Sequence, residues 1–270
     1  MVDNASGDGS ADLARHLRPD AKIVKTGENC GYAAGVNAGI ATSTGRRAVL
    51  VCNPDVRLGH SAIPSLLAAL ARPGAGISAP RTTRPDGQLV YSLRRDATVR
   101  RVLGEAVLGG TRACRVASLS QVVGDRREYE SSHPVAWAAG SVLMCSRACL
   151  DAVGPWDESF FMYAEEVDFQ MRAREHGFSV WYTPDATAVH VGGDLHRSRQ
   201  LWALQMRNRV RLFARRHNRL HTAGFRAACV LNEVIRIPVG GGIHRAGLQA
   251  LLGPLDEGIE IEGPSAAIRP

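Results

Sequence analysis

The chain has 270 residues, of which 45% are hydrophobic and 22% are charged, proportions that are ordinary for a globular protein able to bury a substantial core. Its 33 basic and 26 acidic residues give a formal charge of +7 and a pI near 9.4, which favours an anionic partner such as a nucleotide, a phospholipid or a nucleic acid. We expect neither a membrane span, which needs roughly 18–20 apolar residues in a row, nor a signal peptide.

Six cysteines are present, without a CxxC pair or a spacing typical of zinc sites. Cys30, Cys52 and Cys145 lie in apolar stretches, so we expect them to be small buried thiols. Free thiols persist in a reducing compartment. We therefore expect a cytoplasmic protein, which a peripheral position at the inner face of the membrane would also satisfy.

Short strands and helices alternate through the first part of the chain. Residues 22–25 and 48–52 are typical of strands, and the continuous apolar run 48–52 is typical of a buried parallel strand. Residues 32–42 predict a helix that is bounded by Gly31 and Gly45. The alternation predicts an α/β sheet of largely parallel strands. The next expected elements are a helix over 62–72, a strand from 76 to 79 and a hairpin at 86–87.

Further strands are expected on both sides of an acidic helix. Residues 112–133 are polar and irregular and predict a loop. Residues 135–145 and 178–182 predict strands. Between them, the helix formers of 164–174 predict a helix that begins near Ala164.

Residues 156–172 place five carboxylates beside a cluster of aromatic side chains. A carboxylate against apolar surface has a raised pKa, which suits a general base. On the expected helix Glu165 and Asp168 share a face, and Glu166 points about 100° away from Glu165. The alternative is an ordinary helix start, where the helix dipole favours acids and Asp168 pairs with Arg172.

Two strand ends carry candidate metal ligands. Asn53-Pro54-Asp55 follows the apolar strand 48–52 directly, and ligands of open α/β sheets bind at the carboxyl ends of strands. A carboxylate at Asp55 suits a divalent cation that is bound to phosphates, although the same tripeptide is also a common turn. His190 ends another apolar run and is either a metal ligand or a structural histidine.

The C-terminal part of the chain is strongly basic. Residues 195–250 contain eleven arginines and one acid, Glu233, on a mostly helical pattern. Pro238 and the glycines at 240–242 divide this pattern into at least two helices. The residues after the helices, 253–270, are acidic and proline-containing and predict a loose tail.

This basic region has two interpretations. Ile235, Ile237 and Val239 lie beside arginines, which fits an amphipathic surface attracted to anionic lipid. The arginines in question are Arg226, Arg236 and Arg245. The alternative is an arginine-rich helical cap that packs on the preceding domain. A nucleic acid is not an expected partner, because the chain has no recognisable binding motif and no set of stacking aromatics.

Five segments of the chain together are far more specific than any one of them. They are VDNASGDGS (2–10), GENCGYAAGVNAGI (27–40), VCNPDV (51–56), AAGSVLMCSRACLDAVGPWDESFFMYAEEVDFQMRAREHGF (138–178) and PDATAVHVGG (184–193). In this order they resemble the nucleotide-sugar glycosyltransferases of family 2, and most of all their bacterial rhamnosyltransferase-like branch. The resemblance implies a GT-A fold, with a mixed, mostly parallel sheet flanked by helices in residues 1–194. A basic helical extension over 195–252 and the tail over 253–270 would follow.

The resemblance also implies the catalytic and donor-binding residues. Glu166, the second member of the Glu165-Glu166 pair, corresponds to the general base, and Glu165 supports it. Asp3 corresponds to the acid that holds the nucleobase, with Asn4 next to it. Asn37 corresponds to an asparagine that lines the donor site.

Metal and acceptor sites are implied in the same way. Asp55 corresponds to the last acid of the DxD motif, which carries the metal and the diphosphate. His190 corresponds to a histidine on the metal side. Trp156 and Asp157 correspond to the aromatic and acidic pair that contacts the acceptor. The implied cofactor is a divalent metal, Mg²⁺ or Mn²⁺.

These residue types suit the chemistry of sugar transfer. Attack on an anomeric carbon requires a base that removes the proton of the acceptor hydroxyl. The departing nucleoside diphosphate requires a metal or other cations to stabilise its charge. We therefore expect a metal-dependent, inverting glycosyltransferase that takes a sugar, such as the deoxyhexose rhamnose, from a nucleotide-sugar donor. Its acceptor would be a glycan, a polyprenyl-linked glycolipid or a small molecule.

The chain departs from the family pattern at three places. Asn53 stands where the DxD motif has its first acid, and Glu166 stands where an aspartate is usual. The first strand and helix of the family are missing before Val2, which should leave the neighbouring strands of the sheet unpaired. We expect the true start to lie upstream. The alternative is a truncated, non-catalytic relative that acts as a binding or scaffold protein.

Overall fold

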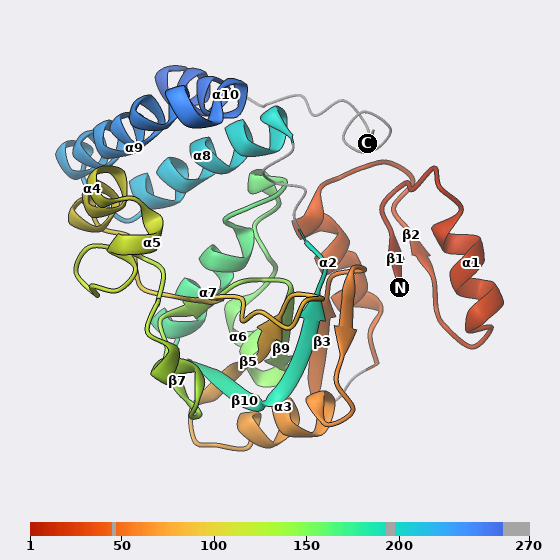
Figure 1. Ribbon diagram of the computed structural model, residues 1–270. Coiled ribbons are helices and arrows are strands. Elements are labelled where there is room, and N and C mark those ends of the chain that lie inside the picture. Colours follow the sequence, from red (N-terminus) through yellow and green to blue (C-terminus); the bar gives the residue numbers. More distant parts are fainter. Residues whose placement is uncertain (45–46, 193–197, 256–270) are drawn as a thin grey trace.

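A six-stranded mixed sheet forms the centre of the protein (Figure 1). The computed structural model describes residues 1–44, 47–192 and 198–255. The strand order is β3–β9–β5–β10–β4. Strand β4 pairs with residues 188–190 of β10, and β7 pairs with residues 180–182 of the same strand. The strands are β3 (Ala48–Cys52), β4 (Val56–Leu58), β5 (Ala75–Thr83), β7 (His133–Val135), β9 (Val142–Ser146) and β10 (Ser179–His190).

The sheet is mixed, as the sequence predicts, but its neighbouring strands are antiparallel more often than expected. Within the described part of this central sheet only β5 and β10 pair in parallel. Strands β3 and β5 do run in the same direction, but β9 lies between them and runs against both. Apolar runs of this kind indicate burial on both faces, and they do not fix the direction of a neighbour.

Helices cover both faces of the sheet, which explains why β9 is apolar at successive positions. Val142 and Met144 pack with α3 (Ala62–Leu70), whereas Leu143 and Cys145 belong to the core on the other face. That second face is covered by helices α2 (Tyr32–Thr42), α6 (Arg147–Val153) and α7 (Glu165–Glu175).

The N-terminal strands form a small sheet of their own. Strands β1 (Val2–Asp3) and β2 (Val24–Lys25) pair in parallel, with α1 (Ser10–Leu17) between them in the chain. Figure 1 shows this unit at the right, apart from the central sheet. Within the described residues β3 pairs only with β9, and β1 only with β2. Strands β1 and β3 therefore each have one open edge in the described part of the chain.

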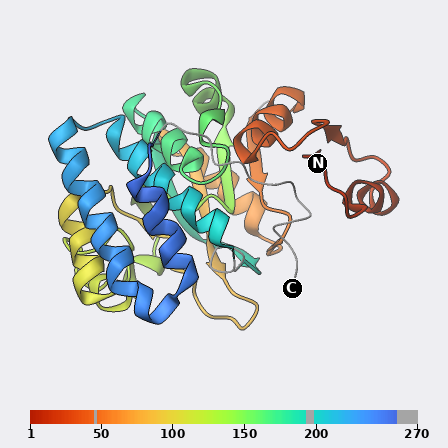
Figure 2. The same ribbon diagram turned by 90° about the horizontal axis from the view of Figure 1, so that it is seen from above.

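Five helices form a second layer, which we call the helical cap. They are α4 (Val99–Leu108), α5 (Gly110–Ala113), α8 (Arg199–Ala214), α9 (Arg219–Gly240) and α10 (Gly242–Leu252). Val102 of α4 is buried with Val210, Phe225 and Leu251 of the later helices. Figure 2 shows the cap at the end of the molecule opposite to the N-terminal unit. The basic extension therefore shares its core with α4. The domain boundary predicted at residue 194 lies outside the described residues.

Several local predictions need correction. Pro238 lies inside α9 and does not end it; the helix ends at Gly240, and Gly241, whose φ is +56°, separates it from α10. The division predicted for this region therefore falls at the glycines, and the proline removes only its own hydrogen bond to the preceding turn. The strand expected over 178–182 continues to His190, because β10 resumes its pairing with β5 after an irregularity between Thr183 and Thr187.

The segment between β5 and β9 also contains more structure than expected. The predicted loop 112–133 includes the end of α5 and a 3-10 helix, η1 (Arg126–Tyr129). The strand expected over 135–145 is divided into parts of β7 and β9 and a short strand, β8 (Trp137–Ala138), which pairs with β6 (Leu93–Arg94).

All six cysteines are free, but they are not equally buried. Cys145 is buried, as expected, whereas Cys30 is half-buried and Cys52 is exposed. Cys52 is the last residue of β3, which pairs with β9 and lies at the edge of the described sheet. This position explains its exposure. None of the helices in the described part of the chain combines the length and the apolarity needed to cross a membrane.

Candidate active site

Glu165 and Glu166 form the first turn of α7, as the sequence predicts. The Glu165 side chain is buried, with 3% of the residue exposed. One oxygen of each carboxyl, Oε2, is shielded from solvent and has no hydrogen-bond partner among the described residues. A buried carboxyl oxygen without a partner is costly, so the pair indicates a site of chemistry more than a site of packing.

Burial raises the pKa of both carboxyls. It raises the pKa of Glu165 to about 8, with a further contribution from the charge of Glu166. Burial also raises the pKa of Glu166, while the N–H groups of the helix start and the positive charge of Arg94 act in the opposite direction. A carboxylate with a raised pKa binds protons more strongly, which suits general-base catalysis near neutral pH.

The loop before this pair is strained. Phe161, Tyr163 and Ala164 have φ angles of 61°, 65° and 80°, in the left-handed region that residues with a side chain rarely adopt. Such conformations persist only where the surrounding structure holds them. Here the loop is held from two sides.

On one side the loop is held by Asn208, a buried residue of α8. Its Nδ2 group lies within hydrogen-bond distance of the carbonyl oxygens of Phe160 (2.7 Å), Met162 (2.9 Å) and Tyr163 (3.2 Å). Its Oδ1 accepts a hydrogen bond from Arg211. One side chain of the helical cap thus binds three carbonyls of the strained loop.

On the other side the loop contacts the start of α2. The Tyr32 N–H donates to the Phe161 carbonyl at 2.6 Å. At Gly31 a Cβ atom would lie 2.4 Å from the same carbonyl oxygen, and the φ of Gly31 is +88°. Only glycine combines this backbone angle with such a close approach. A glycine at residue 140 has a similar role, since a Cβ there would lie 2.7 Å from Cγ of Glu166.

Asp55 and His190 lie together at the carboxyl ends of their strands. His190 Nε2 is 3.1 Å from Asp55 Oδ2, and the Gly192 N–H donates to the same oxygen at 3.0 Å. No group of three or more potential metal ligands occurs among the described residues. A divalent cation that uses one or two protein ligands and takes the others from phosphates and water fits this pair. Asp55 and His190 are therefore the residues that would hold it.

Tyr32 connects the two parts of the site. Its hydroxyl donates a hydrogen bond to Asn53 Oδ1 at 2.8 Å, beside Asp55. Burial raises the pKa of Tyr32, and the negative charges of Glu166, Glu165 and Asp55 raise it further. The phenol therefore stays neutral between the carboxylates and keeps its proton for hydrogen bonding.

Asp3 and Asn4 shape the turn at the end of β1. Asp3 is buried and accepts a hydrogen bond from the Ser6 N–H, which lowers its pKa. Asn4 binds the following loop through Thr26, Asn29, Cys30 and Gly31. Both residues thus fix the loop that leads into α2. Their predicted contact with the donor nucleotide stays a prediction.

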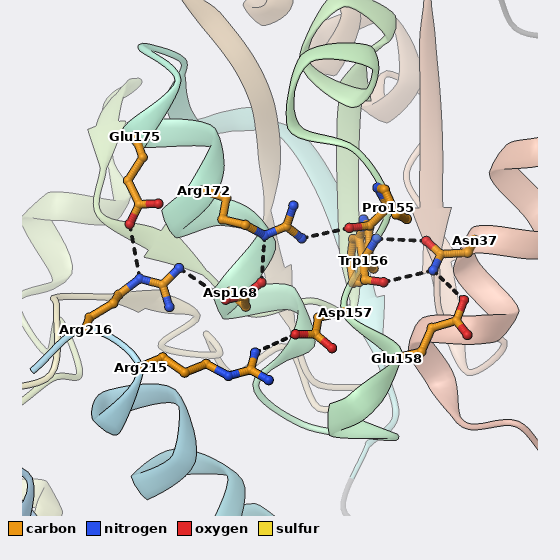
Figure 3. A pocket seen from close by; sticks show the side chains of 10 residues that line it. All are labelled: Asn37, Pro155, Trp156, Asp157, Glu158, Asp168, Arg172, Glu175, Arg215 and Arg216. Atoms are coloured by element: carbon orange, nitrogen blue, oxygen red, sulfur yellow. Dashed lines mark hydrogen bonds and ion pairs between the residues drawn. The ribbon is translucent and has the colours of Figure 1, made fainter.

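Asn37, Trp156 and Asp157 lie together in a separate pocket of about 690 Å³ (Figure 3). The Asn37 amide exchanges hydrogen bonds with the backbone of Trp156, 2.9 Å in each direction, and donates to Glu158. Trp156 is buried and stacks on Phe169. The structure thus makes Asn37 a clamp between α2 and this loop, and contacts of these residues with donor or acceptor stay predictions.

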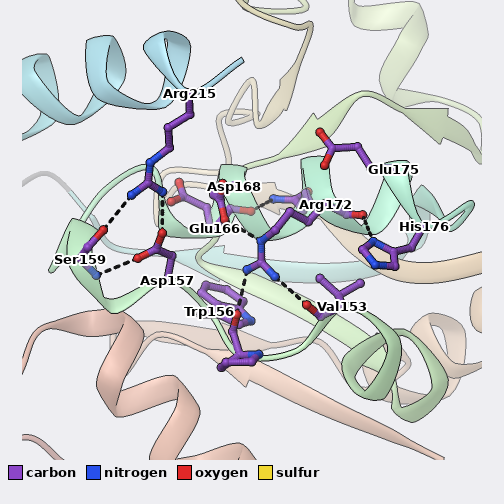
Figure 4. Close-up of polar contacts among 12 residues, drawn as sticks. Val153, Trp156, Asp157, Ser159, Glu166, Asp168, Arg172, Glu175, His176 and Arg215 are labelled. Carbon is purple, nitrogen blue, oxygen red and sulfur yellow. Dashed lines mark hydrogen bonds and ion pairs between the residues drawn. The ribbon is translucent and has the colours of Figure 1, made fainter.

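The charged groups of this pocket are mutually paired. Asp168 binds Arg172 at 2.7 Å and Arg216 at 3.1 Å. Figure 4 shows Arg215, which directly follows α8, bonded to Asp157 and Ser159. Asp157 also caps the short 3-10 helix η2 (Glu158–Phe160). These pairs attach the residues that follow α8 to α7 and to the segment before it.

Three residues of the site escaped the sequence analysis. Tyr32 lies in one of the segments that carry the family resemblance, so a signal for it existed. Arg94 lies in the short strand β6, where its charge reaches Glu166, and nothing local marks it. Asn208 lies 46 residues beyond Met162, and only the fold brings it to the loop.

Known proteins with similar sequences are glycosyltransferases. Residues 1–120 match the family described as Glycosyl transferase family 2. The chain is 34% identical over 209 residues to N-acetylglucosaminyl-diphospho-decaprenol L-rhamnosyltransferase of Mycobacterium tuberculosis, a match over 70% of this chain and 65% of that protein. It is 29% identical over 193 residues to the low-salt glycan biosynthesis hexosyltransferase Agl10 of Haloferax volcanii, a match over 70% of this chain and 57% of that protein. The chain thus matches less than two thirds of the length of either relative.

Similar folds occur in solved glycosyltransferases. The mannosyltransferase PcManGT from Pyrobaculum calidifontis, in complex with GDP-Man and Mn²⁺, has a TM-score of 0.53 at 15% identity over 93% of this chain and 64% of that chain. GalNAc-T7 with UDP, GalNAc and Mn²⁺ has a TM-score of 0.52 at 10% identity, over 78% of this chain and 40% of that chain. The architecture is therefore that of the GT-A glycosyltransferases. Residues 1–120 thus belong to glycosyltransferase family 2, and the chain as a whole is similar to a rhamnosyltransferase and a hexosyltransferase.

The arrangement predicts how the glutamate pair controls the pH dependence of sugar transfer. Glu166→Gln should lower kcat on the order of 10²- to 10⁴-fold, because glutamine cannot accept the proton. The base is active when deprotonated, so activity of the wild type should be lost as the pH falls through the raised pKa of the pair. Glu165→Gln removes the repulsion between the two carboxylates and should shift this acidic limb of the pH profile, where activity is lost, to lower pH. Rate profiles against pH measure both effects.

The control for these variants is Glu130→Gln, which changes an exposed glutamate outside the site. It should leave the profile of the wild type unchanged. An unaltered rate in Glu166→Gln would show that another group is the base. If the acidic limb of the pH profile stays in place in Glu165→Gln, the two carboxyls do not titrate as a pair.

The contacts of Asn208 predict a specific loss of activity when it is truncated. Asn208→Ala leaves three carbonyls of the strained loop without their donor, at a cost of about 1–3 kcal/mol. We expect kcat to fall roughly tenfold or more, since the loop places Glu166. The matched control is Asn218→Ala, which removes the cap of α9 and costs about 1 kcal/mol of stability without touching the loop. Equal kcat values for both variants, well below their melting temperatures, would contradict the assignment.

Proposed function

We propose that this protein is a metal-dependent, inverting glycosyltransferase. In this proposal Glu166 takes the proton of an acceptor hydroxyl while the hydroxyl oxygen bonds to the anomeric carbon of a nucleoside-diphosphate sugar. The bond from that carbon to the diphosphate breaks, and the nucleoside diphosphate leaves with the electron pair. Because attack and departure occur on opposite faces of the sugar, the anomeric configuration is inverted.

One observation carries the proposal: two adjacent carboxyls with raised pKa values start α7, and each has a buried oxygen without a partner. The strand-end pair of Asp55 and His190 belongs to the same site, because the charges of Asp55 and of the two glutamates all act on Tyr32. A binding or scaffold protein has no need of such costly groups, so we do not favour the non-catalytic alternative.

The roles of the remaining site residues follow from their positions. Asp3, Asn4 and the loop that they fix would hold the nucleoside, and Asp55 with His190 would hold Mg²⁺ or Mn²⁺ against the diphosphate. The cation supplies charge stabilisation to the leaving group. Both solved GT-A structures described above contain Mn²⁺, which supports this choice of ion. Tyr32 keeps Asn53 oriented beside the metal carboxylate.

The relatives suggest the donor and the acceptor. The Mycobacterium tuberculosis protein is named for transfer of L-rhamnose to a decaprenyl-diphosphate-linked N-acetylglucosamine. We infer a nucleotide-activated deoxyhexose such as rhamnose as donor and a polyprenyl-diphosphate-linked glycan as acceptor for this chain. Another glycan or a small molecule is the alternative acceptor. With such an acceptor we infer a cytoplasmic protein at the inner face of an anionic membrane.

A donor and acceptor panel tests the reaction itself. The purified protein should transfer rhamnose from dTDP-L-rhamnose to N-acetylglucosaminyl-diphospho-polyprenol, and other nucleotide sugars should react more slowly. NMR of the product should show the anomeric configuration opposite to that of the donor. A product with the donor's configuration would rule out the inverting mechanism. Absence of transfer from every donor would favour the non-catalytic alternative.

Metal dependence has a test of its own. A chelator should abolish transfer, and Mn²⁺ or Mg²⁺ should restore it. Asp55→Asn should weaken metal-dependent binding of the nucleoside diphosphate, measured by calorimetry with and without Mn²⁺, because one carboxylate ligand is lost. Asp185→Asn is the matched control, since Asp185 is exposed on the strand that carries His190. Binding that is equally metal-dependent in Asp55→Asn would remove Asp55 from the metal site.

A further inference from the structure

The outer face of the helical cap carries an apolar stripe. On α9, Leu231, Val234, Ile235 and Val239 are exposed, with 93% of Val239 accessible to solvent. Their spacing of three or four residues aligns them on one side of the helix. A stripe of this kind normally faces a core, yet here it faces outward.

Helix α4, which packs beside α9, carries exposed apolar side chains of its own. Leu103, Val107 and Leu108 are exposed on α4, with 69% of Val107 accessible. The two helices are in contact, since Arg236 of α9 donates a hydrogen bond to the carbonyl of Glu105 at 2.8 Å, and Figures 1 and 2 both show them side by side. A groove of about 640 Å³ runs along α4, lined by apolar side chains and Arg100. We call these seven exposed side chains of α4 and α9 the docking face.

The cap that carries this face presents a single sign of charge. Residues 97–124 and 198–255 contain fourteen arginines and two acids, Glu105 and Glu233. Glu233 is fully buried against Trp202 and His244, and Glu105 is largely buried against Arg209. In the described part of the cap no carboxylate is therefore exposed to solvent. Arg100, which lines the groove, and Arg112 and Arg115, which follow α4, are exposed.

We propose that the docking face binds the surface of an anionic lipid bilayer. Its aliphatic side chains would enter the boundary between headgroups and acyl chains, and the surrounding arginines would contact lipid phosphates. The inference rests on the proposed function only in that a polyprenyl-linked acceptor lies in such a bilayer. Because α8 of the same cap binds the loop before Glu165 through Asn208, docking would also present the site to the membrane.

The observations favour a membrane over other occupants. A second copy of the chain would bring two arginine-rich surfaces together, and like charges repel. A nucleic acid would match the charge, but the exposed apolar side chains are aliphatic and offer no stacking surface for bases. An anionic bilayer matches both the apolar centre and the basic surroundings.

The structure also changes the surface that the sequence suggested. Ile235 and Val239 face outward as expected, whereas Ile237 is half-buried. Arg226 donates to the carbonyls of Leu251 and Gly253 and thereby holds the end of α10. The residues of α4, which the sequence analysis did not connect with this region, provide the other half of the surface.

Vesicle binding tests the proposal. The full chain should bind vesicles of phosphatidylcholine and phosphatidylglycerol in equal parts more tightly than vesicles of phosphatidylcholine alone, and salt should weaken this binding. The double variant Val107→Gln, Val239→Gln should lower the affinity roughly tenfold or more, since two apolar side chains no longer enter the bilayer. Both positions are mainly exposed, so the fold should tolerate the change. The matched control is Leu13→Gln, Leu17→Gln, which alters two exposed leucines of α1 and should leave binding unchanged.

Several outcomes would overturn the proposal. One is equal vesicle binding by the double variant and the wild type. Another is equal binding to charged and uncharged vesicles. A third is a wild type that does not bind vesicles but forms a dimer in ultracentrifugation, while the double variant stays monomeric. That result would identify a second copy of the chain as the occupant. Salt-sensitive binding of the wild type to DNA, without binding to vesicles, would identify a nucleic acid instead.

Activity measurements separate this proposal from the proposed function. The double variant should keep the rate of the wild type towards a water-soluble acceptor with a short alkyl chain, and it should lose rate towards the polyprenyl acceptor in vesicles. Vesicle binding that follows the docking face, in a protein that transfers no sugar to either acceptor, would support the surface and refute the enzyme. Equal loss of rate towards both acceptors in the double variant would refute the membrane role.

Discussion

The burial of two adjacent carboxyls at the start of α7 is the constraint on which the rest of this structure depends. Each of Glu165 and Glu166 has an oxygen that is shielded from water and lacks a hydrogen-bond partner among the described residues. Burying such groups costs free energy that a sheet and its helices must offset elsewhere. The strained φ angles of the preceding loop add to this cost. Neither feature would persist unless neighbouring elements held the loop in place.

The holding contacts explain why the helical cap and the sheet form one functional unit. Asn208 reaches the loop from α8, and Gly31 with Tyr32 reaches it from α2. Tyr32 in turn bonds Asn53, which precedes Asp55 by two residues. Residues from the beginning, the middle and the end of the chain thus fix one short segment. A change in the cap far from the substrates can therefore alter catalysis, since the position of the base depends on it.

The sequence could predict elements that have a local signal and residues that lie in motifs of a known family. The bounds of α2 and β3 follow from glycines and an apolar run, and both were predicted over their observed residues. That Asp55 and His190 both lie near strand ends was predictable. Their contact depends on the antiparallel pairing of Val56 with His190, which a local signal does not reveal. The order and direction of the strands depend on long-range pairing, so β9 between β3 and β5 could not be foreseen. Asn208 gave no signal, because an asparagine in a basic helix has no local reason to be buried.

The carboxylates of α7 show how partners separate structural from chemical roles. Asp168 lies one turn after Glu165 and carries the same type of charged group, but it binds Arg172 and Arg216 in the pocket that Asn37 and Trp156 also line. The positive charge of Arg94 acts on Glu166 without an ion pair, and burial keeps the pKa values of both glutamates raised. A paired carboxylate has its charge neutralised and is a poor base, whereas a carboxylate without such a partner gains stability when it takes a proton. The side of the helix on which arginines are placed therefore decides which acids hold the fold and which can do chemistry.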